Sequence, residues 1–258
     1  MSKPWYKTNN PAMKEEYFVG SGSYSGSLAG TQTGVMTVNG TVAKTGLLLS
    51  IVFAMGIVGY LFPNPVLAMA AIVLAIVAAI VGMFKREWAM PISLAYSVLE
   101  GYALGFISLL YSIQFADTQY KGIVPMAMAA TFAVFGTMLT LYVTRVIKVT
   151  DTFRTIVWGA TAGAMLFYLG TFLISFVMPG IYEALPVFSA GPIGIGFSLL
   201  MIVLAAANFA TDFDMIERGV EARAPKYMEW FGAFAVMLTI VWLYLEMLRL
   251  ISKIARSR

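Results

Sequence analysis

Residues 65–84 read PVLAMAAIVLAIVAAIVGMF, which is twenty consecutive residues without a charged side chain. As an α-helix this stretch would be about 30 Å long, which is the thickness of the hydrocarbon core of a bilayer. Lipid offers no water to unpaired backbone groups, so a segment of this kind is expected to be helical. The stretch therefore predicts a transmembrane helix.

Similar apolar runs fill most of the remaining chain, and they cover residues 45–62, 91–114, 123–146, 155–178, 193–216 and 228–252. The alternating pattern of a membrane β-barrel is absent. We predict an all-α polytopic membrane protein with seven transmembrane helices within residues 43–258. Residues 1–42 are rich in Gly, Ser and Thr and carry little apolar surface, so we expect them to form a flexible polar tail.

The composition excludes several classes of protein. Only 12% of the 258 residues are charged, whereas a soluble domain has about 25%. The net charge of +4 is small and dispersed, and it does not indicate nucleic-acid binding. The chain has no Cys and no His, which excludes disulfides, thiolate nucleophiles and histidine-based metal sites. Acid–base chemistry would have to use carboxylates, Lys, Arg or Tyr.

The distribution of Lys and Arg predicts the orientation. If the N-terminus is cytoplasmic, twelve of the seventeen basic residues lie on the inner side. The basic residues at 249–258 disagree with this assignment, so the last segment either crosses the membrane or re-enters and returns inside. We favour the crossing, and we expect a multi-pass membrane protein with a cytoplasmic N-terminus.

Acidic side chains inside the predicted spans are the strongest functional signal, because each costs at least about 2.5–3.5 kcal/mol to insert. Four acids in the spans are singled out as candidates: Glu100, Asp212, Asp214 and Glu246. Glu100 has no cation nearby on its own helix, so it requires a proton, a partner from another helix or an ion. We expect Glu100 to face the interior of the bundle.

The other three acids also have structural explanations. Asp214 lies near the charged end of its helix and is typical of a solvated helix terminus. Glu246 can pair with Arg249 three residues later, and Asp212 can form bonds within the bundle. Asp212 shares a helix face with Asn208, four residues earlier. Asp212, Glu246, Glu100 and Asn208 are therefore candidates for an ion or proton site.

Three short motifs carry a family resemblance: LEGYALG at 99–105, DFDMI at 212–216 and LYLE at 243–246. Together with the seven spans, they resemble the Bax inhibitor family, the transmembrane Bax-inhibitor-motif proteins and their bacterial relatives, especially the actinobacterial branch. The resemblance covers about residues 45–252. It implies a fold in which six helices surround a central seventh, a place in a bacterial plasma membrane, and a pH-sensitive calcium leak.

The resemblance also implies roles for single residues. In the family, two aspartates on the last two helices share a proton, and a basic residue near the second helix locks the closed form. Asp212 matches the first aspartate, and Glu246 matches the second as a glutamate. Lys85 and Arg86 are the candidates for the lock. Calcium is implied as the permeant or bound ion at Asp212 and Glu246, and no cofactor is implied.

The spacing of the last two helices argues against a direct pair. If the turn lies near Ala224, Asp212 is twelve residues before it and Glu246 is twenty-two residues after it. The resulting mismatch is about 15 Å. Either the last helix starts with an extension or a break that brings Asp212 and Glu246 together, or Glu246 meets Glu100 instead.

The expected function is therefore a pH-sensitive calcium leak, with lipid, calcium and protons as partners. One alternative is a non-conducting regulatory protein that binds proteases or other membrane proteins. Another is a proton-coupled transporter, although no internal repeat supports it. An aspartyl intramembrane protease is disfavoured because its Gly-x-Gly-Asp signature is absent, and we do not expect an enzyme.

Overall fold

The computed structural model describes residues 34–257, and helices make up most of this range. Seven helices are long and apolar enough to cross a membrane, which confirms the predicted fold class. Their bounds are α1 (Val38–Leu61), α2 (Pro65–Phe84), α3 (Ala89–Gln114), α4 (Ile123–Val143), α5 (Asp151–Ser175), α7 (Pro192–Glu221) and α8 (Met228–Arg256). Three short elements connect them: η3 (Arg86–Trp88), α6 (Ile181–Ala184) and η4 (Pro186–Phe188).

The first helix begins earlier than the sequence predicted. The side chain of Thr37 accepts a hydrogen bond from the backbone N–H of Gly40 and caps α1, which starts at Val38. Residues 38–42 of the expected flexible tail are therefore helical. The rest of that expected tail, up to residue 33, lies outside the described residues.

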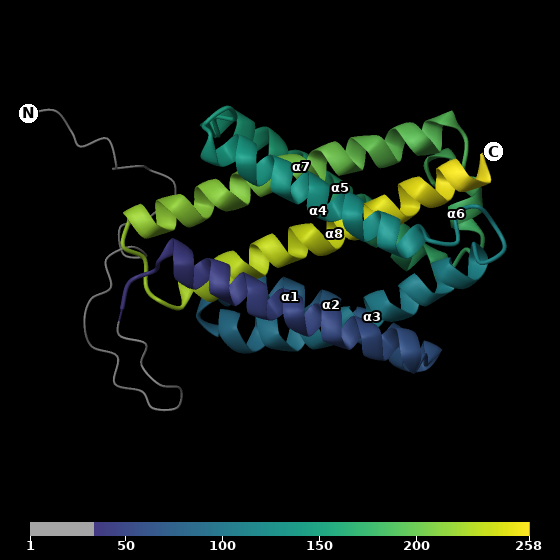
Figure 1. Ribbon diagram of the computed structural model, residues 1–258, viewed down its shortest axis with the longest axis horizontal. Coiled ribbons are helices and arrows are strands. Elements are labelled where there is room, and N and C mark those ends of the chain that lie inside the picture. The colour runs from purple at the N-terminus through teal and green to yellow at the C-terminus, as the bar shows by residue number, and fades with distance from the viewer. Residues whose placement is uncertain (1–33, 258) are drawn as a thin grey trace, which may run out of the picture.

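The last helix, α8, occupies the centre of the bundle (Figure 1). In its apolar window 67% of the residues are buried, against 11% to 56% in the other spans. It packs against α1, α3, α4 and α7. The predicted central C-terminal helix is therefore confirmed.

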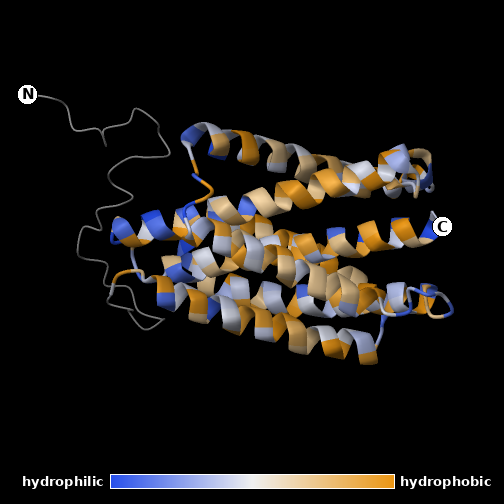
Figure 2. Cartoon of the chain, turned by 45° about the horizontal axis from the view of Figure 1, so that its top comes forward, coloured by the Kyte–Doolittle hydropathy of each residue, from blue (hydrophilic) through white to orange (hydrophobic). Residues whose placement is uncertain are grey.

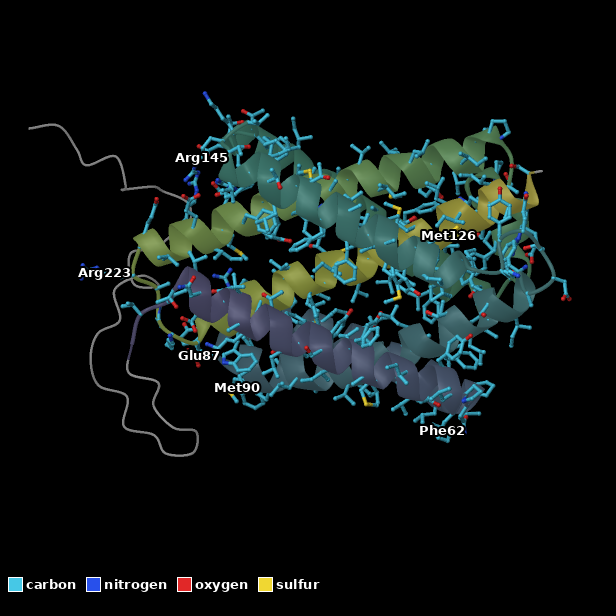
Figure 3. The ribbon with its side chains drawn as sticks, viewed as in Figure 1. Phe62, Glu87, Met90, Met126, Arg145 and Arg223 are labelled. Atoms are coloured by element: carbon cyan, nitrogen blue, oxygen red, sulfur yellow. The ribbon has the colours of Figure 1, made fainter. Side chains whose placement is uncertain are left out.

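The start of α1 and the end of α8 lie at opposite ends of the bundle (Figure 1). The last segment consequently crosses the bundle and does not re-enter. We call the end with the start of α1 the inner end, in line with the predicted orientation, and the opposite end the outer end. Figure 3 shows Glu87, Arg145 and Arg223 toward the inner end and Phe62 toward the outer end.

Helices α1 and α3 touch backbone to backbone. A Cβ atom on Gly105 would overlap the carbonyl group of Gly56, and one on Gly59 would overlap the carbonyl group of Tyr102. Small residues allow this close approach in membranes, where apolar burial does not by itself bring helices together. Strongly hydrophilic residues gather mainly toward the ends of the helices (Figure 2).

Candidate functional site

One face of α8 carries a line of polar residues through the bundle. Thr239, Glu246 and Lys253 follow one another at intervals of seven residues. Seven residues are close to two helical turns, so the three side chains lie on nearly the same face. All three are buried. We call these three residues, together with Asp212, which contacts the first of them, the polar stripe.

Contacts at both ends of the stripe fix the register of α7 against α8. Oδ2 of Asp212 accepts a hydrogen bond of 2.7 Å from Oγ1 of Thr239, and Nζ of Lys253 donates one of 2.9 Å to Oγ of Ser198. Midway between these contacts, the register places Ala205 opposite Glu246. Asp212 therefore lies two turns, about 10 Å, from Glu246 along the hairpin. The direct pair that the resemblance implies is not formed in this structure.

Glu246 is completely buried, and only one of its two carboxylate oxygens accepts hydrogen bonds from the described residues. Its Oε1 accepts hydrogen bonds from the hydroxyl of Tyr168 at 2.8 Å, Nη1 of Arg249 at 2.9 Å and Nε1 of Trp242 at 3.3 Å. Its Oε2 has no partner within residues 34–257. The predicted pair with Arg249 is confirmed. The alternative in which Glu246 meets Glu100 is wrong for this structure, since Glu100 is not among the partners of Glu246.

Glu100 lies at the depth of Asp212, on another side of α8. Ser97 and Met237 are in contact at 3.1 Å, and α3 runs parallel to α8. Three residues beyond Ser97, Glu100 is therefore nearly level with Thr239. The residues one turn before and after it on α3, Tyr96 and Leu104, are buried, and Glu100 itself is half-buried, so it lies on the packed side of α3. It has no hydrogen bond to another described residue.

Asn208, predicted as a site candidate beside Asp212, has its hydrogen bonds within residues 34–257 to α5 and to its own helix. Its Nδ2 donates hydrogen bonds to Oγ1 of Thr161 at 2.7 Å and to the carbonyl oxygen of Leu204 at 2.9 Å. The amide nitrogen therefore joins α7 to α5. Thr161 belongs to a series of three polar residues on α5 at intervals of seven: Arg154, Thr161 and Tyr168. Each of the three forms a hydrogen bond with a residue of α7 or α8.

The two gate candidates lie outside the stripe. Lys85 caps the end of α2, and Arg86 belongs to η3 at the inner end. Both are exposed, and the guanidinium of Arg86 lies 5.3 Å from the ring centre of Phe231. Within residues 34–257, neither forms a salt bridge with an acid. A lock of Lys85 or Arg86 on Asp212 is therefore not present in this structure.

Asp214 lies toward the inner end, as predicted, but its side chain is only 14% exposed, so it is not the solvated helix terminus that the sequence indicated. Its Oδ2 lies 2.7 Å from Nη2 of Arg154 and 2.9 Å from Nε of Arg218. Nearby, the guanidinium of Arg145 forms an ion pair with Glu217. The carboxylate of Glu217 raises the pKa of Arg145 by stabilising its charged form. These contacts tie the ends of α4, α5 and α7 together.

Sequence reasoning missed Glu229, a completely buried acid in the first turn of α8. Its carboxylate accepts hydrogen bonds from N and Oγ1 of Thr37 at 2.9 and 2.8 Å. It also forms ion pairs with Lys226 at 2.8 Å and with Lys44. We call Thr37, Lys44, Lys226 and Glu229 the inner clamp. The sequence feature that could have revealed this clamp is the spacing of Lys226 and Glu229, because oppositely charged residues three apart on a helical turn lie side by side.

The other missed group is Lys253, since a basic residue near the C-terminus suggested solvent. Its side chain is instead buried among oxygen atoms. Within residues 34–257, no three acids come together to hold a metal ion. Asp212 and Glu246 are too far apart along the stripe to chelate one calcium ion jointly. A cation in the stripe would meet these carboxylates one after the other.

A comparison with known families decides the membership of the chain. A family described as Bax inhibitor 1 like matches residues 6–256. The chain belongs to the Bax inhibitor 1 like family. Neither the curated proteins nor the solved structures contain a match. The Bax inhibitor 1 like match spans all seven membrane helices, and it includes the polar stripe and the inner clamp.

Proposed function

We propose that this Bax inhibitor 1 like protein is a pH-sensitive cation leak that passes calcium along the polar stripe. The observation that carries the proposal is Glu246, a completely buried carboxylate whose Oε2 has no partner among the described residues 34–257. It lies on the same face of the central helix as Thr239, which contacts Asp212. Ionisable groups within membranes are costly to keep, and they typically mark ion or proton pathways.

In this mechanism the two acids act as successive sites. Calcium prefers carboxylate oxygens, and Asp212 and Glu246 each offer one carboxylate at a different depth. Protons compete with the cation for the same oxygens, so acidification should reduce conduction. Arg249 is paired with Glu246 in this structure, and in this mechanism conduction requires the guanidinium to withdraw. The chain catalyses no reaction in this proposal and requires no cofactor.

Calcium entry into dye-loaded proteoliposomes between pH 5 and 8 tests the proposal. We expect Asp212→Asn and Glu246→Gln each to lower the flux several-fold and to weaken its pH dependence. Because the two sites lie about 10 Å apart, the effects should combine nearly additively on a free-energy scale. The matched control is Asp151→Asn, an exposed acid at the start of α5. Flux no greater than in protein-free liposomes would refute the leak.

A non-conducting role with a membrane partner is the second candidate. A groove of about 270 Å³ opens between α1 and α4, and its lining includes Phe53, Ile57, Met128 and Phe132. A partner's helix with small apolar side chains can pack in such a groove. A tryptophan substitution at Met128 that leaves flux intact but abolishes co-purification of a membrane protein would favour this role.

A further inference from the structure

The outer end of the polar stripe contains a buried ammonium group. Lys253 is 6% exposed. Its Nζ donates hydrogen bonds to the carbonyl oxygen of Val187 at 2.7 Å, the carbonyl oxygen of Gly194 at 2.8 Å and Oγ of Ser198 at 2.9 Å. A lysine ammonium has three donors and no acceptor, so its hydrogen-bonding capacity is filled. All three partners are neutral oxygens.

These oxygens are held in place by contacts that do not involve Lys253. Gly194, in the first turn of α7, lies so close to the carbonyl group of Ser189 that a Cβ atom would overlap it. The element η4 is closed by the bond from the Ser189 N–H to the carbonyl oxygen of Pro186. The ring of Phe188 stacks on that of Phe167 from α5 at 5.9 Å. The three oxygens therefore converge on one point because of how η4 packs on α7.

We propose that the oxygens of Val187, Gly194 and Ser198 form a binding site for a monovalent cation, which the chain keeps filled with the ammonium group of Lys253. Neutral carbonyl and hydroxyl oxygens are the ligands that replace the hydration shell of monovalent ions in membrane pores. Calcium prefers carboxylates, and none of the three ligands is one. The site should accept ammonium or potassium once the side-chain cation is removed.

Occupancy by Lys253 would also close the stripe at its outer end. A fixed positive charge there repels a cation that moves along Asp212 and Glu246. This consequence rests on the proposed leak, whereas the cation site does not. The two statements are therefore tested by separate measurements.

Thermal unfolding in detergent, followed by tryptophan fluorescence, tests the site. The variant Lys253→Met keeps the apolar stem and removes the ammonium group. We expect its Tm to rise by about 2–4 °C when N-methyl-D-glucamine is replaced by ammonium chloride. The control is Arg256→Met, which removes an exposed cation one turn later on α8. Its Tm should not distinguish the two salts.

Adding Ser198→Ala to Lys253→Met removes one of the three oxygen ligands. The rise in Tm on adding ammonium chloride should then be smaller than in Lys253→Met alone. An equal response in Lys253→Met and Arg256→Met would overturn the site. If Lys253→Met does not fold even in ammonium, Lys253→Gln replaces it, and a lack of response there also overturns the site. Calcium flux is measured separately: an ammonium response without increased flux supports the cation site and contradicts only the closure of the stripe by Lys253.

Discussion

At the scale of single residues, two buried glutamates on α8 differ in how their oxygens are paired. Both oxygens of Glu229 are paired with residues of the inner clamp, whereas Glu246 is paired only through Oε1 and its Oε2 has no partner within residues 34–257. The sequence predicted Arg249 as a partner of Glu246 because both lie on one helix. It did not predict Tyr168, since a partner from α5 depends on how the helices pack.

Neutralising Glu229 should destabilise the protein. In Glu229→Gln the ammonium groups of Lys44 and Lys226 lose their counter-charge, and breaking a buried ion pair is strongly destabilising. We expect an apparent Tm about 5–10 °C lower in detergent. Glu221→Gln, an exposed acid at the end of α7, is the control. Equal Tm values for the two variants would contradict a stabilising clamp.

Two glycines of α1 should respond differently to the same substitution. A Cβ on Gly40 would overlap the carboxylate of Glu229, whereas a Cβ on Gly46 meets nothing within 4 Å. Gly40→Ala should therefore lower the Tm by several degrees, and Gly46→Ala should leave it unchanged or raise it, because Ala favours helices over Gly. Loss of stability in Gly46→Ala alone would show that the clamp is not the cause.

At the scale of elements, the register of the α7–α8 hairpin decides which acids meet. The sequence placed the turn near Ala224 and gave a mismatch of about 15 Å between Asp212 and Glu246. The structure retains a mismatch of about 10 Å, since Asp212 lies opposite Thr239. The direction of the offset was predictable from helix geometry. The size of the offset was not predictable, because the position of the turn depends on a contact distant in sequence, the hydrogen bond from the Met36 N–H to the carbonyl oxygen of Ala224.

Crosslinking of paired cysteines tests this register in a chain that has no cysteine of its own. Asp212→Cys combined with Thr239→Cys should react with a short thiol-specific crosslinker. After the α7–α8 loop is cleaved, the crosslinked fragments should stay joined and run as one band on denaturing gels. Asp212→Cys combined with Glu246→Cys should remain uncrosslinked at the same reagent concentration. Efficient crosslinking of the second pair would restore the direct pairing implied by the family.

At the scale of the whole molecule, six helices around a central seventh could be predicted from apolar length and family resemblance. The orientation in the membrane stays a prediction from the Lys and Arg distribution. The packing order could not be predicted, since apolar residues face both lipid and neighbouring helices. Backbone contact joins α1 to α3, whereas α5 depends on polar bonds to α7 and α8.

Thiol labelling of intact bacterial cells tests the orientation. A cysteine at Asp117, in the exposed α3–α4 connection, should react with a membrane-impermeant reagent added outside. A cysteine at Lys148, in the exposed α4–α5 connection, should react only after the cells are permeabilised. The reverse pattern would place the N-terminus outside.

The attachment of α5 also bears on the order of synthesis. Ribosomes make α5 before α7 and α8, so Arg154, Thr161 and Tyr168 enter the nascent protein before their partners Asp214, Asn208 and Glu246 exist. By contrast, α1 can dock on α3 as soon as α3 has left the ribosome. Until the final hairpin arrives, the hydroxyls of Thr161 and Tyr168 lack these partners while α5 lies in lipid or is sheltered by the insertion machinery. Truncated chains that end before residue 192 should therefore be the most vulnerable to quality-control proteases.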